Sequence, residues 1–173
     1  MADRRSFLRG GSVLLASAAL ADVLTAFATE PRRATFFNEG ELATLRALVD
    51  VVLPATDSPA ASAADTHFFI DLAIPACASE TAQRTFRAGL RELGSVGYAD
   101  AKAPKQVALL KLRADADAAL DYDLAFFTIL KDYTLTGYFL SEVGATQALA
   151  YERVPGGFWG DLPLEPGQKA WAT

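Results

Sequence analysis

Apolar and polar residues follow helical spacing along most of the chain, and the clearest case begins after Asn38. Apolar residues recur three and four positions apart from Leu42 to Leu53, which predicts an amphipathic helix. Asn38 and Glu41 have the spacing of a capping box, in which each side chain bonds to the backbone N–H of the other. Pro54 is expected to end the helix, because proline has no N–H to donate and disfavours the helical conformation of the preceding residue.

The same spacing predicts further helices downstream. Their expected limits are Ser62 to Pro75, Ser79 to Gly97, a stretch opened by Pro104 with Val107, Leu110, Ala114 and Ala118 on one stripe, and Tyr122 to Glu142. No segment alternates with a period of two for long enough to predict a strand. From about residue 150, turn-forming residues and aromatics replace the helical pattern. The sequence therefore predicts an all-α fold, a single small helical domain with an extended, irregular C-terminal tail.

The N-terminus has the three parts of a secretory signal: a basic start, a short apolar segment and a small-x-small end. The apolar segment, Gly10 to Ala21, is too short to span a bilayer, and Asp22 interrupts it. Ala26-Phe27-Ala28 supplies the small-x-small end. We expect a signal peptide over residues 1–28 and one domain over residues 29–173. The predicted cut follows Ala28, and retention of the leader as an anchor stays open.

Two adjacent arginines ahead of a Phe-Leu pair favour the twin-arginine form of this signal. The residues expected to carry the export function are Arg4, Arg5, Phe7 and Leu8. The twin-arginine (Tat) machinery exports proteins that are already folded, so its cargo usually holds a cofactor or a partner acquired in the cytoplasm. The destination predicted for this chain is the periplasm.

Charge, cysteine content and the lack of known motifs argue against a nucleic-acid partner, an internal disulfide and a cofactor in this chain. The chain has 16 Lys and Arg against 21 Asp and Glu, a net charge of −5, and no long basic run follows the leader, which argues against nucleic acid as a partner. Cys77 is the only cysteine, so no internal disulfide can form, and a buried apolar role is expected for it. No glycine-rich phosphate loop or hydrolase motif occurs, and no cofactor is expected in this chain.

Two polar groupings are candidate sites. His67, the only histidine, precedes Asp71 by one helical turn, so a hydrolase using both is a weak alternative to a structural histidine. Four aspartates form the densest carboxylate cluster: Asp115, Asp117, Asp121 and Asp123. They lack the glycine and glutamate of an EF-hand loop, so a solvated acidic junction is expected, with a bound cation or a basic partner surface as alternatives.

The aromatic residues are the better candidates for a binding surface. Neighbours on a helix point about 100° apart, so an adjacent aromatic pair is fully covered only on a widely buried helix, through core packing or contact with another chain. The candidate interface residues are the helical pairs Phe126, Phe127, Tyr138 and Phe139 and the tail aromatics Phe158, Trp159 and Trp171.

Two stretches resemble the gluconate 2-dehydrogenase subunit 3 family. The first runs from Leu48 to Asp71 and contains VLPATDSPA followed by FFID. The second, more similar stretch runs from Phe127 to Thr173 and contains TLTGYFLSEVG and YERVPG. The chain departs from the family at Pro59-Ala60-Ala61, where members often have Pro-Gly-Ala, and it lacks the cysteine that many members have near Asp161.

The resemblance implies a small subunit without a catalytic, cofactor or metal site of its own. In such complexes the large subunit is an FAD-containing oxidoreductase of the glucose-methanol-choline (GMC) type that acts on sugars, glycosides or polyols. Electrons pass to a c-type cytochrome, which would be a third subunit that carries haem c. The complex is periplasmic or membrane-associated. The small subunit would lend its export signal to the flavoprotein and stabilise it.

Taken together, a twin-arginine leader on a body without cofactor motifs predicts a partner that carries the cofactor. The main alternative is a free-standing periplasmic helical protein, either a ligand-binding module with an apolar pocket or a chaperone.

Overall fold

The computed structural model describes residues 12–29, 32–152, 156–157, 163 and 166–171, and these residues are mostly helical. The α-helices are α2 (Ser12–Thr29), α3 (Glu39–Val52), α4 (Thr66–Cys77), α5 (Glu80–Ser95), α6 (Ala103–Asp117) and α7 (Phe126–Phe139). Three short helices complete the set: η1 (Ala61–Ala64), η2 (Tyr122–Leu124) and the π-helical η3 (Gly144–Ala148). Over the described ranges there is no strand, only an isolated bridge between Ala150 and Trp171, so the all-α prediction is confirmed.

The predicted helix starts that depend on local capping are confirmed. The Glu41 N–H donates to Asn38 Oδ1 at 2.8 Å and the Asn38 N–H donates to Glu41 Oε2 at 3.1 Å, so α3 begins with a complete capping box. The helix ends at Val52, just before Pro54. Ser79 Oγ accepts a hydrogen bond from the Ala82 N–H at 3.1 Å at the start of α5.

Both predicted limits of the helix over Ser62 to Pro75 were wrong. The helix expected to stop at Pro75 begins later, at Thr66, and continues through Pro75 to Cys77. Its late start follows from Asp65, whose left-handed backbone (φ 54°) separates it from η1. Pro75 is tolerated because it lies in the last turn, where its missing N–H removes a single intrahelical bond.

The helix predicted over Tyr122 to Glu142 is divided. Tyr122–Leu124 forms the short η2, Ala125 is extended (φ −99°, ψ 91°), and α7 runs only from Phe126 to Phe139. The new start is fixed from outside the segment, because Asp117 of α6 accepts a hydrogen bond from the Phe127 N–H at 2.9 Å. Capping by a distant helix leaves no local sequence signal.

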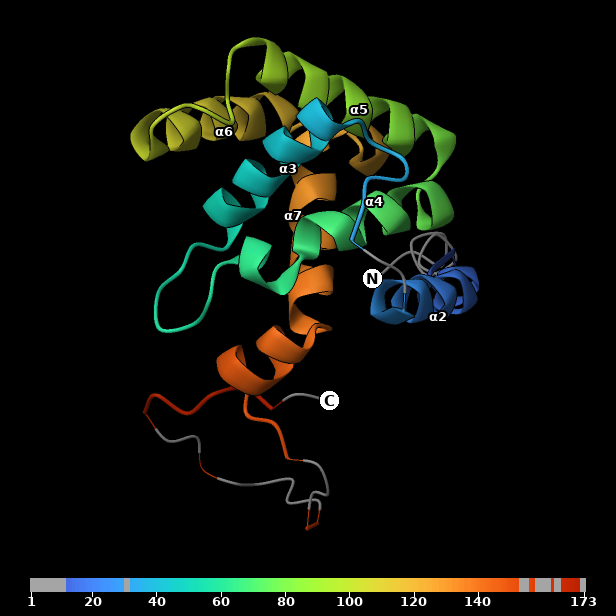
Figure 1. Ribbon diagram of the computed structural model, residues 1–173, viewed down its shortest axis with the longest axis vertical. Helices are drawn as coiled ribbons and strands as arrows, with labels where there is room; N and C mark the ends of the chain where they lie inside the picture. Colours follow the sequence, from blue (N-terminus) through green and yellow to red (C-terminus); the bar gives the residue numbers. More distant parts are fainter. Residues whose placement is uncertain (1–11, 30–31, 153–155, 158–162, 164–165, 172–173) are drawn as a thin grey trace, which may run out of the picture.

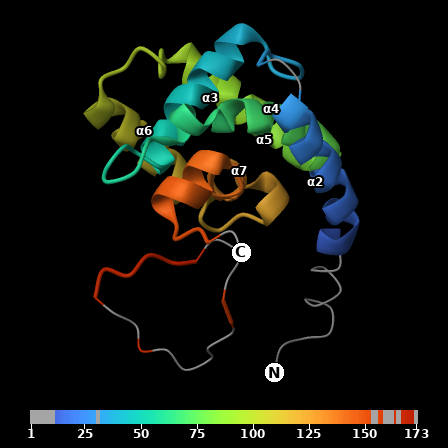
Figure 2. The same ribbon diagram turned by 60° about the horizontal axis from the view of Figure 1, so that its bottom comes forward.

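Helix α7 crosses the middle of the body, with α3, α4, α5 and α6 packed against it (Figures 1 and 2). Its buried residues Ile129 and Leu130 meet Leu45, Phe86 and Leu90 in one core. Two glycines allow close packing of rings on backbone: a Cβ on Gly137 would overlap the Phe69 ring, and one on Gly89 would overlap the Phe126 ring.

Helix α2 lies along α4 at the edge of the body, and the described residues that follow η3 lie beyond the end of α7, away from the other helices (Figures 1 and 2). Among the described residues, no helix combines the length and the apolar character that crossing a bilayer requires.

Candidate functional site

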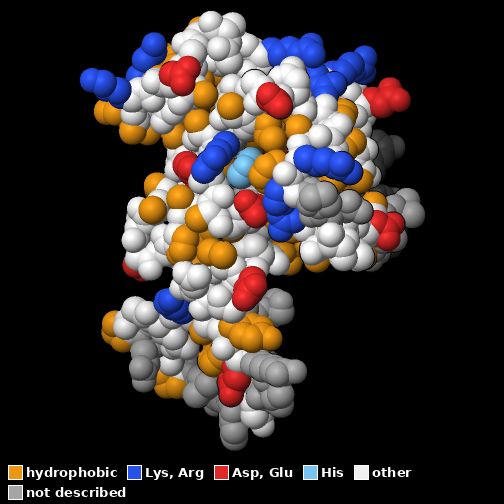
Figure 3. Space-filling view, viewed as in Figure 1, with side chains coloured by type: hydrophobic (Ala, Val, Ile, Leu, Met, Phe, Trp, Pro, Cys, Tyr) orange, Lys and Arg blue, Asp and Glu red, His pale blue; other side chains and the backbone are white. Residues whose placement is uncertain are grey.

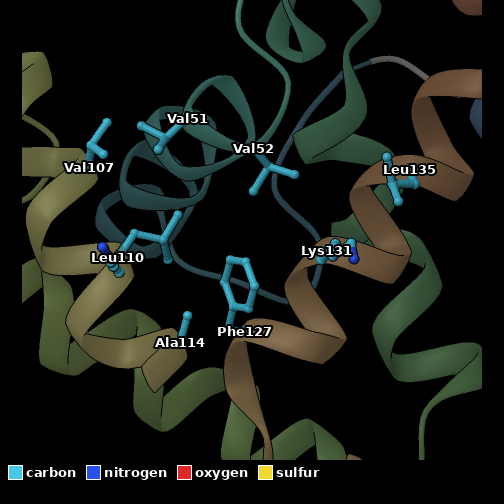
Figure 4. Close-up of a pocket in the computed structure, with 9 residues that line it drawn as sticks. Val51, Val52, Val107, Leu110, Ala114, Phe127, Lys131 and Leu135 are labelled. Atoms are coloured by element: carbon cyan, nitrogen blue, oxygen red, sulfur yellow. The ribbon is translucent and has the colours of Figure 1, made fainter. Parts of the chain in front are cut away.

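An apolar groove opens on the surface between the C-terminal end of α3, one face of α6 and the first turns of α7. Figure 4 shows side chains from the three helices converging on it. Its lining residues are Val51, Val52, Val107, Leu110, Lys111, Ala114, Phe127, Lys131 and Leu135. The cavity has a volume of about 370 Å³, enough to receive one or two large side chains.

The groove exists because α6 covers the body incompletely. Only Leu110 and Asp117 of this helix are buried, so most of its apolar stripe remains accessible. Val107 is 52% exposed at the mouth of the groove, while Leu110 forms part of the floor. An accessible apolar stripe beside an open groove is the usual mark of a binding surface.

Phe127 is held in the groove wall by a network of charged groups. The Asp117 carboxylate is buried, accepts from the Phe127 N–H and pairs with Arg113 at 3.2 Å. Arg113 also pairs with Glu92 of α5 at 2.7 Å. These bonds connect α5, α6 and α7 behind the groove, so its wall is preorganised before anything binds.

The rim of the groove is positively charged although the chain is acidic overall. Lys111 and Lys131 are exposed and stand among the lining residues, which include no Asp or Glu. Figure 3 shows several Lys and Arg side chains at the end of the body formed by α5 and α6, with Asp and Glu side chains among them. The groove is therefore suited to an apolar group that has a carboxylate beside it.

The structure divides the predicted aromatic pairs between core and surface. Phe126 (0% exposed) packs against Phe86 with ring centroids 5.2 Å apart, and Tyr138 (2% exposed) donates from its hydroxyl to the Pro59 carbonyl at 2.8 Å. Both side chains therefore pack within the chain itself. Phe127 lines the groove and Phe139 is 36% exposed, because each faces outward from its buried neighbour.

The structure describes one of the three tail aromatics. Trp171 is 55% exposed and forms the isolated bridge with Ala150. Phe158 and Trp159 lie outside the described residues, as do the leader residues Arg4, Arg5, Phe7 and Leu8. Of the candidate aromatics that the structure describes, Phe127, Phe139 and Trp171 are at least partly exposed.

His67 and Asp71 lie one turn apart on α4, but among the residues that the structure describes the Asp71 carboxylate accepts its hydrogen bonds from other residues. The fully buried Asp71 carboxylate accepts hydrogen bonds from the backbone N–H groups of residues 35–37 and from the Thr35 hydroxyl. His67 is buried, and within the described part of the chain its Nδ1 has no hydrogen-bond partner. Asp71 anchors the segment before α3, so it does not orient the imidazole as a hydrolase would require.

Burial lowers the pKa of His67 below its ordinary value of 6.5, and the nearby Arg46 charge acts in the same direction. The folded state therefore keeps a neutral ring at a pH where the unfolded chain takes up a proton. We expect the free energy of unfolding to fall as the pH drops through about 6.5, by at most about 1.4 kcal/mol per pH unit. Denaturant unfolding at pH 7 and pH 5 checks this: His67→Gln should flatten the decrease, and an unchanged slope would contradict the assignment.

The acidic cluster is divided among structural roles. Asp117 is buried in the network behind Phe127, and Asp123 accepts a hydrogen bond from Ser79 Oγ at 2.7 Å. Asp115 and Asp121 are exposed. Over the described ranges, no group of three or more His, Cys, Asp or Glu side chains is placed to hold a metal ion.

Cys77 is partly buried, and burial raises the pKa of its thiol.

The sequence indicated two parts of the groove: the stripe of Val107, Leu110 and Ala114, and Phe127 as a candidate contact. The opposite wall of Val51 and Leu135 and the lysine rim depend on how α3, α6 and α7 meet. Helical spacing shows which residues share a face, but not which face a neighbouring helix leaves uncovered. No local signal could have located the complete groove.

Together, these observations describe a small all-α protein with an apolar surface groove between α3, α6 and α7. A scan against family models matches residues 39–156 to the family described as gluconate 2-dehydrogenase subunit 3. The chain belongs to this family, and it is thus related to a small subunit of a dehydrogenase complex. Comparison with curated proteins and with solved structures gave no match.

Proposed function

We propose that this chain is the non-catalytic small subunit of a periplasmic, FAD-dependent dehydrogenase of the GMC type that oxidises a sugar, glycoside or polyol. The observation that carries the proposal is the family match over residues 39–156, which spans α3 to α7. The FAD and the catalytic groups belong to the large subunit. A c-type cytochrome with haem c is the proposed electron acceptor, and the complex would reach the membrane through its other subunits.

The groove between α3, α6 and α7 is the proposed docking site for the large subunit. Its apolar lining and its two rim lysines favour a partner segment that inserts an apolar side chain and places a carboxylate near Lys111 or Lys131. Phe139 and Trp171 would extend the contact. A stable interface of this kind needs to bury on the order of 1,600 Å² in total, far more than the groove alone provides.

The leader would direct the complex to the twin-arginine export machinery. FAD is inserted in the cytoplasm, so a flavoprotein without a signal must cross the membrane folded, attached to a chain that has one. Arg4 and Arg5 supply the twin-arginine motif for both subunits in this proposal. Binding of the small subunit would then both export the flavoprotein and stabilise it.

Val107→Glu tests the docking site, because Val107 is half exposed and contributes little to the core. A glutamate there would place a charge at the mouth of the groove and repel the proposed partner carboxylate. We expect the flavoprotein to be lost from the tagged small subunit on co-purification after co-expression. We expect binding to weaken by about 2 kcal/mol or more, roughly 30-fold, which is the usual effect of disrupting a hot-spot contact.

Leu112→Glu is the matched control. Leu112 lies on the same helix and is 67% exposed, but it does not line the groove, so this variant should keep its partner. Thermal unfolding of both variants checks that each has folded. Equal retention, or equal loss, of the flavoprotein by the two variants would exclude the groove as the docking site.

A further inference from the structure

The second half of the export leader is packed into the folded body. Helix α2 continues without a break from Ser12 to Thr29, through the small-x-small sequence Ala26-Phe27-Ala28. Val23 of this helix is only 5% exposed and belongs to the hydrophobic core. Leu20 and Leu24 pack against the same core from the neighbouring turns.

Phe27 is the principal contact at the expected cleavage site. Its ring meets the buried Phe69 of α4 edge to face, with centroids 5.9 Å apart. On the other side, the Arg32 guanidinium stacks over the ring at 3.9 Å from its centroid and also donates to the Phe27 carbonyl. Arg32 is fixed in turn by an ion pair with Asp65 at 2.9 Å.

We infer that this docking protects the Ala28–Thr29 bond from hydrolysis, so that the exported protein keeps its leader helix as a structural element. A protease binds its substrate as an extended strand, with backbone hydrogen bonds to the enzyme. The backbone of residues 26–29 is helical here, and Thr29 Oγ1 still bonds to the Thr25 carbonyl at 2.9 Å. Cleavage would therefore require the end of α2 to unwind and Phe27 to leave Phe69.

The route of export makes this protection effective. A twin-arginine cargo folds before it crosses the membrane, so α2 would already be docked when a signal peptidase meets it. The arginine pair lies ahead of α2 in the sequence, so its recognition and the docking of Leu20 to Phe27 use different residues. The leader can act first as an export signal and afterwards as a helix of the folded protein. This inference concerns the chain itself and does not depend on which partner it carries.

The intact mass of the chain, carrying a C-terminal tag and recovered from the periplasm after co-expression with its partner, tests the inference. We expect a mass that includes α2. Phe27→Ala keeps small residues at positions 26 and 28, where a signal peptidase needs them. It should raise the population of undocked helix on the order of 100-fold and produce chains that begin at Thr29.

Thr25→Ala is the control, since Thr25 is exposed on the same helix, and its product should match the wild type. Arg32→Gln leaves the apolar packing of α2 intact but removes the cation over Phe27, so it should give partial cleavage even if Phe27→Ala does not accumulate. A wild-type chain that begins at Thr29 would overturn the inference. So would retention of α2 in Arg32→Gln and in any Phe27→Ala protein recovered, because docking would then not be what protects the bond.

Discussion

Replacing Asp71 with alanine is expected to lower the free energy of unfolding by about 3–5 kcal/mol, a large share of the roughly 5–15 kcal/mol of a typical domain. The Asp71 carboxylate is fully buried and accepts four hydrogen bonds. Its donors are the Thr35 N–H and hydroxyl, both at 2.6 Å, the Phe36 N–H at 3.1 Å and the Phe37 N–H at 2.7 Å. Alanine would leave these donors without an acceptor in a buried setting.

Denaturant unfolding of Asp71→Ala and Asp115→Ala side by side measures this effect. Asp115 is exposed on α6, and its replacement should change stability by no more than about 0.5 kcal/mol. Asp71→Asn adds a second comparison, since its NH₂ group would face a backbone donor and make up only part of the loss. Equal stability of Asp71→Ala and Asp115→Ala would contradict the anchoring role.

Changing both Arg4 and Arg5 to lysine is expected to abolish export of the small subunit and of the flavoprotein together. Lysine keeps the charge but loses the planar, multidentate hydrogen bonding of the guanidinium group, so a site built for arginine should reject it. Dehydrogenase activity in the periplasmic fraction should fall to the level of cells that lack the small subunit. The flavoprotein should accumulate in the cytoplasm, where an immunoblot of the fractions would detect it.

Arg9→Lys is the matched control, because Arg9 lies in the same leader outside the adjacent pair. This variant should export both subunits normally. Full periplasmic activity with both Arg4 and Arg5 changed would show that the flavoprotein has another route, and the proposal that it borrows this leader would fail.

Local signals in the sequence predicted the features that depend on them. The capping box of Asn38 and Glu41, the cap at Ser79 and the stop before Pro54 each involve residues a few positions apart, and all three are present. The all-α class followed from the same local evidence, because helical spacing of apolar residues is set within two turns.

Features that depend on contacts between distant segments could not be predicted in this way. The start of α7 is set by Asp117 of another helix. The role of Asp71 depends on Thr35 and Phe37, which lie 36 and 34 positions earlier in the chain. Phe126 and Phe127 are adjacent and chemically identical, but one is in the core and the other lines the groove. Which of the two is accessible depends on where α6 stops covering α7.

The leader shows how one sequence can support two interpretations. An apolar segment with small residues at its end is typical of a cleavable signal, and helical apolar spacing is typical of a packed helix. The sequence favoured the first, whereas the packing of Val23 and Phe27 against α4 supports the second. The two are compatible if the segment acts during export and then remains in the fold.

The central claim is that this chain binds a flavoprotein and leaves the cytoplasm with it. The most direct measurement is to purify the tagged wild-type chain from the periplasm and determine its flavin content and associated chains by absorbance and mass spectrometry. The account predicts a stable complex with one larger chain that carries FAD and oxidises a sugar, glycoside or polyol. Recovery of the small chain alone, without flavin or a larger chain, would contradict it.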